Sequence, residues 1–425
     1  MGKLFGTSGV RRRVSELPPE FVIALARALA TYTPDEKIVI GRDTRKSGPL
    51  LESAFISGLI SSGKNVIDIC LVPTPTVGVA TAEHGTGVMV TASHNPPEYN
   101  GFKFWNTSGA YNPEQENAVE KIFFSKKFKK GKRCGVVEKR NYVEKHINLI
   151  LKKIGTVNDV RVLVDCAGGA GSVITPKLLE KMGCDVIAIN TNQDGNFPHE
   201  LEPTAENLAE TCKLVKKKKV DIAFAHDGDA DRTAAIGKDG KLIEWDSFLS
   251  VLAYDLDRVV TTVDASMRIE DVCNEVIRTK VGDVFVAEGI RKNNADFGGE
   301  PSGAYIFPDI HIFPDGIATV AKTVSMVADG FFYERLEEIK SYPMERVKIP
   351  CGEDEKGIIM DNLKKIIKED YDDTDGIRIS TDEGWILIRP SGTEPYVRIT
   401  AEGVDRNALD ELVGEGREWI GKARK

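Results

Sequence analysis

The sequence has 425 residues, of which 41% are hydrophobic and 29% charged, a composition typical of a folded globular enzyme rather than a disordered or fibrous chain. Lys plus Arg number 57 and Asp plus Glu 65, and the resulting formal charge of −8 argues against a nucleic-acid or anionic-membrane binder. No apolar run approaches the roughly 20 residues of a bilayer span, and the N-terminus lacks the apolar core of a secretion signal. The seven cysteines include no C-x-x-C pair, so we expect reduced cysteines and a cytoplasmic location.

The first 150 residues alternate strand and helix patterns. Strands are expected over 37–40, 65–71 and 87–91, and helices over 21–32, 49–62 and 141–153, with a short helix after Pro73 and Pro75. This βαβ rhythm predicts a mostly parallel sheet. Residues 121–133 carry seven positive side chains and no acid. An anion-binding patch is one interpretation, but a solvated helix end and linker is favoured in an acidic chain.

The rhythm restarts twice and then changes. After 151 we expect strands over 160–164, 185–189, 220–225 and 259–263 and helices over 172–182, 204–218, 246–256, 269–278 and 316–328, with 284–287 a strand or a helix start. The tail predicts strands over 347–349, 377–380, 385–388 and 397–401 and helices over 355–369 and 406–422, which favours a small antiparallel sheet. The fold class is therefore α/β, with three similar domains of mixed, mostly parallel sheets (1–150, 151–248, 249–343) and a smaller α+β domain (344–425).

The first cluster of chemical interest is TASHNPPEYNGFKFW, residues 91–105. Ser93 follows a strand directly, and the two prolines stiffen the loop behind it, which suits a covalent nucleophile or a phosphate carrier. The α/β-hydrolase elbow G-x-S-x-G is absent. Lys103 could neutralise phosphate charge or move a proton. A Pro-bounded turn with a solvated lysine is the alternative, and the segment alone does not decide between them.

A second cluster, AHDGDADRTAAIG at 225–237, places Asp227, Asp229 and Asp231 after a buried strand. Three crowded carboxylates repel one another unless a cation lies among them, and oxygen ligands favour Mg²⁺. An EF-hand loop does not fit, because Arg232 and Lys238 stand where it needs Gly and Glu. A charged surface turn is disfavoured, because the cluster directly follows the apolar run VDIAFA.

Four further segments are candidates for ligand binding. RPSGTEPYVRI (389–399) combines a guanidinium, hydroxyls and a glycine, as a phosphate cradle does, although a hairpin turn is the alternative. GGEPSGAYIF (298–307) offers Glu300 and Ser302 to sugar hydroxyls, as a weak signal on its own. FGTSGVRRR and GRDTRKSGP add Arg11 and the group Arg42, Asp43 and Arg45, which indicate an anion or ion-pair site more often than a solvated surface.

With these motifs in this order, the sequence resembles the α-D-phosphohexomutase family over essentially its whole length. The resemblance implies four domains around a central cleft and the interconversion of sugar 1-phosphates and 6-phosphates. It implies Mg²⁺, a phosphorylated Ser93 and a hexose 1,6-bisphosphate activator. The expected partner is a small phosphosugar, with no nucleic acid and no membrane, and the resemblance also allows a homodimer.

Site roles follow from the matching motifs. The resemblance makes Ser93 the phosphoryl carrier, with His94, Lys103 and Arg11 as further catalytic residues. It makes the Mg²⁺ ligands Asp227, Asp229, Asp231 and an oxygen of phosphorylated Ser93. The substrate-binding residues it implies are Arg232, Glu300, Ser302, Arg389, Ser391, Gly392, Thr393 and Arg398.

One position departs from the family pattern, because Ala304 stands where many members have a histidine. His311 could replace that histidine or could be structural. The TASHNP and RPSGTEP segments resemble the archaeal phosphoglucosamine mutases most, so glucosamine 6-phosphate is the expected substrate. A phosphomannomutase/phosphoglucomutase is the alternative, followed by a Ser- and Mg²⁺-dependent sugar phosphatase and an inactive sugar-phosphate binder.

Overall fold

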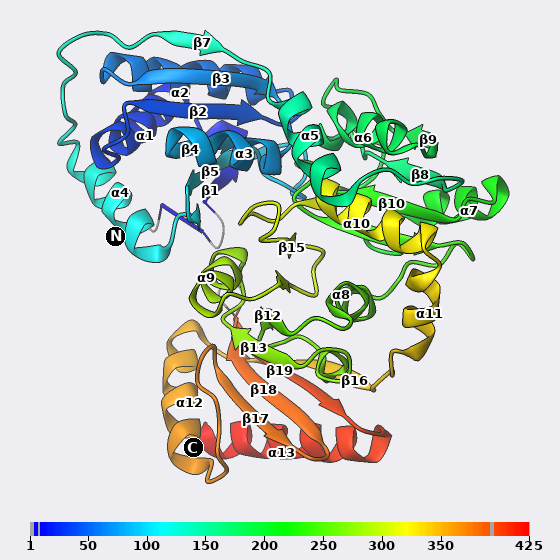
Figure 1. The fold of residues 1–425 in the computed structure, drawn as a ribbon. Coiled ribbons are helices and arrows are strands. Elements are labelled where there is room, and N and C mark those ends of the chain that lie inside the picture. The colour runs from blue at the N-terminus through cyan, green and yellow to red at the C-terminus, as the bar shows by residue number, and fades with distance from the viewer. Residues whose placement is uncertain (1–3, 7–8, 392–394, 425) are drawn as a thin grey trace.

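The computed structural model describes residues 4–6, 9–391 and 395–424, and these residues form four sheets with their helices (Figure 1). The expected α/β class is confirmed, since three sheets are mixed and the last is antiparallel. We call the four sheets, with the helices that cover them, the first to fourth units. They occupy 10–154, 161–237, 245–338 and 344–423. The domain limits expected from the sequence stay a prediction.

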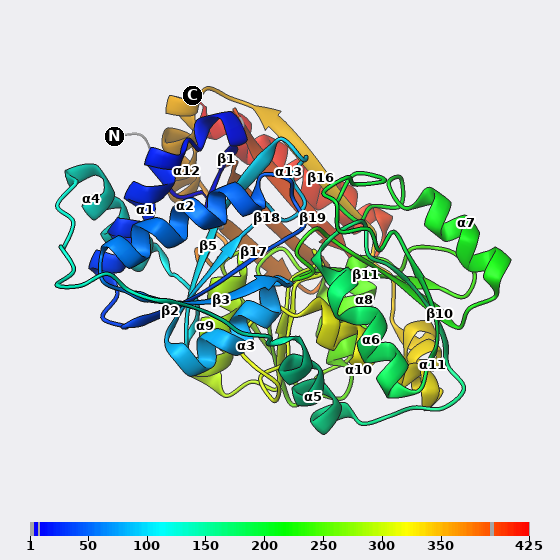
Figure 2. The same ribbon diagram turned by 90° about the horizontal axis from the view of Figure 1, so that it is seen from above.

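The first unit has the strand order β1-β5-β4-β2-β3-β7, with β6 beside β5. Helices α1 and α2 lie side by side over one face, where Ile38 and Ile40 point, and α3 covers the other face, where Val39 points (Figure 2). Its strands are β1 Val10–Arg13, β2 Lys37–Arg42, β3 Asn65–Leu71, β4 Thr86–Val90, β5 Tyr99–Asn106, β6 Gly109–Ala110 and β7 Val137–Lys139. Its helices are α1 Pro19–Tyr32, α2 Gly48–Ser61, α3 Thr74–His84, α4 Pro113–Ser125 and α5 Val143–Ile154.

No strand was predicted over residues 99–106, which form β5. It pairs antiparallel with both β1 and β4, so residues 99–106 lie inside the sheet and Lys103 lies opposite Met89. The residues that follow α4 are mostly exposed, in agreement with the solvated linker favoured for 121–133.

The second and third units share one large apolar core that includes Phe224, Phe248 and Phe297. The second sheet has the order β11-β10-β8-β9 and the third β13-β12-β14-β15, and only β11 and β15 run antiparallel to their neighbours. The second unit contains β8 Arg161–Asp165, α6 Thr175–Met182, β9 Asp185–Ile189, α7 Ala209–Lys218, β10 Ile222–His226 and β11 Thr233–Gly237. The third contains α8 Trp245–Ala253, β12 Arg258–Thr262, β13 Glu275–Thr279, α9 Asp283–Asn293, β14 Phe297–Gly299, β15 Tyr305–Ile306, α10 Gly316–Ala328 and α11 Phe331–Glu338.

The prediction of a helix over 269–278 is wrong. Residues 275–279 form β13, which pairs in parallel with β12 along its full length. The segment EVIRT contains three β-branched residues, which favour a strand when a neighbouring strand supplies hydrogen bonds. At 284–287, where a strand or a helix start was expected, the structure has helix α9.

The fourth unit has the antiparallel order β16-β19-β18-β17, and α12 and α13 cover one face of it, as expected (Figure 1). Its elements are β16 Met344–Pro350, α12 Glu353–Ile366, β17 Ile377–Thr381, β18 Gly384–Pro390, β19 Tyr396–Gly403 and α13 Arg406–Ala423. In the described part of the chain, none of the helices combines the length and the apolar character that a membrane crossing requires.

Candidate active site

Ser93 lies three residues beyond the carboxyl end of β4, in a strained backbone conformation. Its φ of 52° is in the left-handed region, which non-glycine residues adopt infrequently. The Ser93 N–H donates to Thr91 Oγ1 (2.8 Å), which fixes this turn. The Ser93 side chain is 1% exposed and its Oγ donates to Asp227 Oδ2 (2.6 Å). The turn therefore aims the hydroxyl at the acidic loop of the second unit.

The three aspartates follow β10 directly and converge. Carboxylate oxygens of Asp227, Asp229 and Asp231 lie within 4.8 Å of one another, and all three residues are buried. Asp229 Oδ1 and Asp231 Oδ1 have no hydrogen-bond partner among the described residues. Buried carboxylate oxygens without a partner are unfavourable unless a cation binds them, so this donor set fits Mg²⁺.

The glycine between the first two aspartates permits close contact of the two loops. A Cβ atom on Gly228 would lie 2.6 Å from the carbonyl oxygen of Ser93, closer than real Cβ contacts. A second contact comes from Thr74 at the start of α3, whose N–H donates to the Asp229 carbonyl oxygen (2.9 Å) and whose Oγ1 donates to its carboxylate. The acidic loop is thus held against the first unit on two sides.

Lys103 neutralises part of this negative charge. Its Nζ donates to Asp229 Oδ2 (2.7 Å) and to Asp231 Oδ2. Burial alone would lower the pKa of Lys103, but these two carboxylates raise it above its usual value. Burial would raise the pKa of Asp229, but Lys103 lowers it, whereas burial and the neighbouring carboxylates raise the pKa of Asp227. Lys103 is therefore a cation at neutral pH.

His94 and Arg11 lie beside the serine. His94 Nδ1 is 3.4 Å from Ser93 Oγ, and burial together with the neighbouring Arg232 and Arg11 lowers the pKa of His94 to about 3. The imidazole is therefore neutral at physiological pH. Arg11, on β1, donates from Nη1 to Asn95 Oδ1 (3.1 Å) and so braces the loop behind the serine.

A cavity of about 360 Å³ lies in front of Ser93 and receives side chains from all four units. Its cations are Arg11, Lys103, Arg232, Arg346 and Arg398, and its carboxylates are Asp231, Asp264, Asp283 and Glu300. A lining of both cations and carboxylates suits a ligand that carries phosphate and hydroxyl or ammonium groups. Guanidinium groups bind phosphate oxygens, and carboxylates bind hydroxyl or ammonium groups.

The expected sugar loop forms one wall of this cavity, and both Glu300 and Ser302 line it. Glu300 Oε2 accepts the Gly282 N–H (3.0 Å), and burial together with repulsion by Asp283 raises the pKa of Glu300 to about 8. Ala304 also lines the cavity and pairs with Arg232 in an isolated β-bridge.

Of the expected phosphate loop, Arg398 on β19 lines the cavity. Arg389 pairs with Asp375 (3.5 Å), and the Ser391 carbonyl oxygen accepts from Lys356 Nζ (2.8 Å); neither residue is part of the cavity wall. Gly392 and Thr393 lie outside the described residues.

Sequence analysis missed several residues of this site, namely Thr74, Asp264, Asp283 and Arg346. Asp264 follows the expected strand 259–263, so the rule that ligands bind beyond strand ends could have found it. Asp283 begins α9, which was left undecided between strand and helix. Thr74 and Arg346 reach the site only through contacts between units, and no local pattern marks them.

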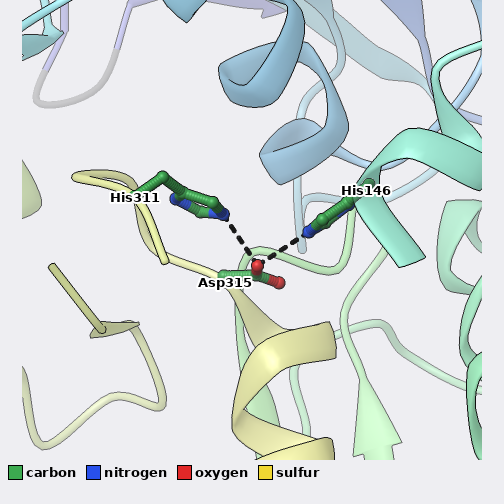
Figure 3. Close-up of side chains that lie close together, drawn as sticks. All are labelled: His146, His311 and Asp315. Atoms are coloured by element: carbon green, nitrogen blue, oxygen red, sulfur yellow. Dashed lines mark hydrogen bonds and ion pairs between the residues drawn. The ribbon is translucent and has the colours of Figure 1, made fainter. Parts of the chain in front are cut away.

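His311 is engaged elsewhere. Its Nε2 lies 2.8 Å from Asp315 Oδ2, which also lies 2.9 Å from His146 Nε2 (Figure 3). Although these three side chains could hold a metal by proximity, His311 Nδ1 accepts the Phe313 N–H (3.2 Å). The proton of neutral His311 is therefore on Nε2, which donates to Asp315 and is not available as a ligand. The cluster ties α5 to the start of α10, and His311 does not replace the family histidine in the cavity.

Family profiles for phosphoglucomutase/phosphomannomutase match the chain in four consecutive parts. The alpha/beta/alpha domains I, II and III match residues 2–130, 140–240 and 246–346, and the C-terminal domain matches 347–418. The chain belongs to this family. The protein is therefore a phosphosugar mutase, an isomerase.

Two relatives that cover the whole chain have the same name. A probable phosphoglucosamine mutase of Pyrococcus abyssi is 43% identical over 447 residues, covering 100% of this chain and 99% of its own. One of Methanopyrus kandleri is 42% identical over 452 residues, covering 100% of both chains.

Solved structures of phosphoglucomutase/phosphomannomutase relatives agree in fold. A family protein of Burkholderia thailandensis superposes with a TM-score of 0.90 at 25% identity, covering 99% of this chain and 98% of its own. The N-acetylphosphoglucosamine mutase of Aspergillus fumigatus, solved with GlcNAc-6P and magnesium, has a TM-score of 0.61 at 16% identity, covering 99% and 96%. At that identity the second comparison supports the fold alone.

Proposed function

We propose that this protein interconverts glucosamine 6-phosphate and glucosamine 1-phosphate through a phosphorylated Ser93 and a glucosamine 1,6-bisphosphate intermediate. The observation that carries the proposal is the placement of Ser93 Oγ, 2.6 Å from Asp227, at the wall of a cavity lined by cations and carboxylates from all four units. Phosphoryl transfer needs mainly positioning and charge stabilisation, and this arrangement offers both.

In this proposal the chain performs the following steps. Ser93 Oγ carries the phosphoryl group; its O–P bond breaks as a sugar oxygen forms a new one, and the reverse transfer returns the other phosphate to Ser93. Mg²⁺, held by Asp227, Asp229, Asp231 and an oxygen of the phosphoserine, would supply positive charge to the transferring group. Lys103 and Arg11 add further positive charge, since both line the cavity beside Ser93.

Lys103 and His94 differ in charge beside Ser93. Lys103 remains protonated because its pKa is raised, so it acts as a cation rather than as a base. The pKa of His94 is lowered to about 3, so its imidazole stays neutral and is a weak base, and it acts as a hydrogen-bonding group beside Ser93 Oγ.

The other expected residues bind the substrate. Arg232, Glu300 and Ser302 contact the sugar and its neighbouring phosphate oxygens. Arg398, which lines the cavity, would hold the phosphate that does not react. Arg389, Ser391, Gly392 and Thr393 stay expected members of this phosphate loop, although Arg389 and Ser391 lie outside the cavity wall. The bisphosphate must fit the same site in two orientations. The site therefore needs one loop that binds either phosphate and a facing loop that contacts the sugar hydroxyls.

The carboxylates of the cavity favour an amino sugar over a neutral hexose. Asp264, Asp283 and Glu300 line the same cavity, and burial, followed by repulsion from the two aspartates, raises the pKa of Glu300. The C2 ammonium group of glucosamine would relieve this repulsion, and a C2 hydroxyl would not. The names of the relatives from P. abyssi and M. kandleri support the same substrate. A phosphomannomutase/phosphoglucomutase activity is the second candidate.

The remaining properties follow from the proposal. A hexose 1,6-bisphosphate would phosphorylate Ser93 and act as activator. We expect a cytoplasmic enzyme, in line with its seven free cysteines. The resemblance also allows a homodimer, and a measurement of the molecular mass in solution would test this. An inactive binder is disfavoured because Ser93 and all three aspartates are present. A phosphatase is disfavoured because the RPSGTEP segment is complete, and a hydrolase has no need to hold an intermediate through two orientations.

A ³¹P NMR time course tests the substrate. Enzyme, Mg²⁺ and a trace of hexose 1,6-bisphosphate are incubated separately with glucosamine, mannose and glucose 6-phosphates. We expect a 1-phosphate resonance to grow fastest from glucosamine 6-phosphate, and Asp283→Asn to lower kcat/KM for that sugar about 10-fold relative to glucose 6-phosphate. Asp309→Asn, at an exposed position, is the control. Growth of inorganic phosphate instead would favour the phosphatase, and faster conversion of mannose or glucose would favour the alternative mutase.

A further inference from the structure

One buried guanidinium group, that of Arg45, bonds several carbonyl oxygens in and next to the loop that carries Ser93. Arg45 is 1% exposed, and its Nη2 donates to the carbonyl oxygens of Ser93 (2.8 Å) and Asn95 (2.6 Å). Its Nη1 donates to the carbonyl oxygens of Pro96 (2.7 Å) and Tyr99 (2.9 Å). Its Nε donates to Asp43 Oδ2 (3.1 Å), so all five N–H groups of this side chain have acceptors.

Asp43 extends this support to the other side of the serine. The same Asp43 Oδ2 accepts from Thr91 Oγ1 (2.6 Å), and Thr91 Oγ1 accepts the Ser93 N–H (2.8 Å). Arg45 thus holds the Ser93 carbonyl directly and, through Asp43 and Thr91, the Ser93 N–H. Both peptide groups that define the left-handed turn at Ser93 are fixed by one ion pair.

The segment around Arg45 also touches the unit that carries the aspartates. Thr44 Oγ1 donates to the Gly168 carbonyl oxygen (2.7 Å), and two residues further on the Ala170 N–H donates to the Gly228 carbonyl oxygen (2.9 Å). The guanidinium lies 5.4 Å from the centre of the Phe197 ring of the same unit. Residues 43–45 therefore contact both the loop of Ser93, which would carry the phosphoryl group, and the unit whose acidic loop would hold the metal.

Resting on the proposed function, we infer that Arg45 is a positioning residue for phosphoryl transfer, which keeps Ser93 Oγ in place against the loop of Asp227. Arg45 does not line the cavity, so it acts through the loop and not on the substrate. A lysine cannot reproduce it, because an ammonium group offers three donors from one atom where four carbonyl oxygens and a carboxylate have to be reached. Its effect falls on the rate of transfer and not on substrate binding.

The test compares Arg45→Lys with Arg42→Lys. Arg42 lies on the same segment but pairs with Glu52 (3.0 Å) and is not bonded to the serine loop. We expect Arg45→Lys to lower kcat about 100-fold with an almost unchanged KM, since small displacements of reacting groups have effects of this size. Arg42→Lys should keep wild-type kcat. Thermal unfolding and the amount of folded protein are measured for both, so that kcat refers to folded enzyme.

A second variant separates positioning from general stability. Arg45→Ala leaves room for methylguanidinium, which should restore part of kcat, whereas methylammonium at the same concentration should not. Wild-type kcat in folded Arg45→Lys, an effect on KM alone, an equal loss in Arg42→Lys, or no rescue of folded Arg45→Ala would each overturn the inference. Failure of the proposed function looks different, because the wild-type enzyme itself would then form no sugar 1-phosphate.

Discussion

At the scale of single residues, the site depends on the balance between three buried carboxylates and one buried ammonium group. Lys103 bonds Asp229 and Asp231, and Asp227 accepts the serine hydroxyl, yet two carboxylate oxygens have no partner among the described residues. Charges taken out of water in this way are costly unless opposite charges compensate them. One divalent cation at this site would supply the missing compensation.

Replacing Asp229 by asparagine tests this balance. We expect Asp229→Asn to weaken Mg²⁺ binding at least about 10-fold and to lower kcat by a similar or larger factor, because one ligand and one negative charge are lost. Mg²⁺ titrations of activity and of thermal unfolding provide both values. Asp239→Asn, at a half-exposed position, serves as control. A Mg²⁺ titration that does not change would remove Asp229 from the ligands.

How much of the site can be predicted depends on where its residues lie in the chain. Ser93 and the three aspartates follow expected strands, so the strand-end rule and their chemistry point to them directly. Thr74 approaches Asp229 from another unit across 155 residues of sequence, and no local pattern encodes that contact. A helix was wrongly expected over 269–278, and 284–287 was left undecided between strand and helix, so Asp283 between them was missed.

At the scale of elements, predictions from local sequence were wrong where pairing with a neighbouring strand determines the secondary structure. The segment EVIRT fits an apolar helical face, but β12 offers it a full parallel register, and strand formation satisfies its backbone groups. Strand β5 follows two prolines and looks like a loop, yet both of its edges are paired. Helix 316–328, by contrast, has a capping Asp315 and was predicted with its observed ends.

A buried carboxylate in the first turn of α8 provides a prediction about pH. Burial raises the pKa of Asp246 to about 6, although the Ser266 N–H donates to its Oδ1 (2.7 Å). The folded protein therefore holds a proton that the unfolded chain releases near pH 4. The free energy of unfolding of the wild type should fall relative to Asp246→Asn as pH rises from about 4 to about 6, by roughly 3 kcal/mol.

Denaturant unfolding of both proteins across this pH range checks that prediction. Only the difference between the two curves is used, because other carboxylates titrate in both. A difference that stays constant with pH would mean that Asp246 is ionised equally in the folded and unfolded states.

At the scale of the whole molecule, the cavity is complete only when the fourth unit is held against the third. Glu402, fully buried, accepts from Ser266 Oγ (2.5 Å), the Met267 N–H (2.7 Å) and Trp385 Nε1 (2.7 Å). Arg378 Nε adds a bond to the Val263 carbonyl oxygen (3.1 Å). These contacts fix the sheet that presents Arg398 to the cavity.

Glu402→Gln should loosen this junction. The amide places a donor where three donors already point, so we expect a loss of about 1–3 kcal/mol in the free energy of unfolding. If the free energy that holds the fourth unit in place falls by about 1 kcal/mol, KM should rise about 5-fold. Glu345→Gln, within the fourth unit and half-exposed, is the control. Unchanged KM in folded Glu402→Gln would show that this junction does not govern substrate binding.

Four units around a central cleft were expected from the resemblance, but the residues that form the contacts between the units were not. The core shared by the second and third units, and the packing of Phe313 against Trp105 of the first unit, involve apolar residues that look like any other core positions in the sequence. Which residues these side chains contact depends on how the units assemble, and composition and periodicity carry no information about that.

The measurement that tests the central claim most directly is a label chase from the phosphorylated enzyme. Wild-type protein is labelled with a [³²P]hexose 1,6-bisphosphate, freed of ligand and mixed with Mg²⁺ and unlabelled glucosamine 6-phosphate. We predict that the label resides on Ser93 and leaves the protein for sugar phosphates, and that Ser93→Ala takes up none while still binding substrate. Label on another residue, label released as inorganic phosphate, or turnover by Ser93→Ala would contradict a mutase that works through Ser93.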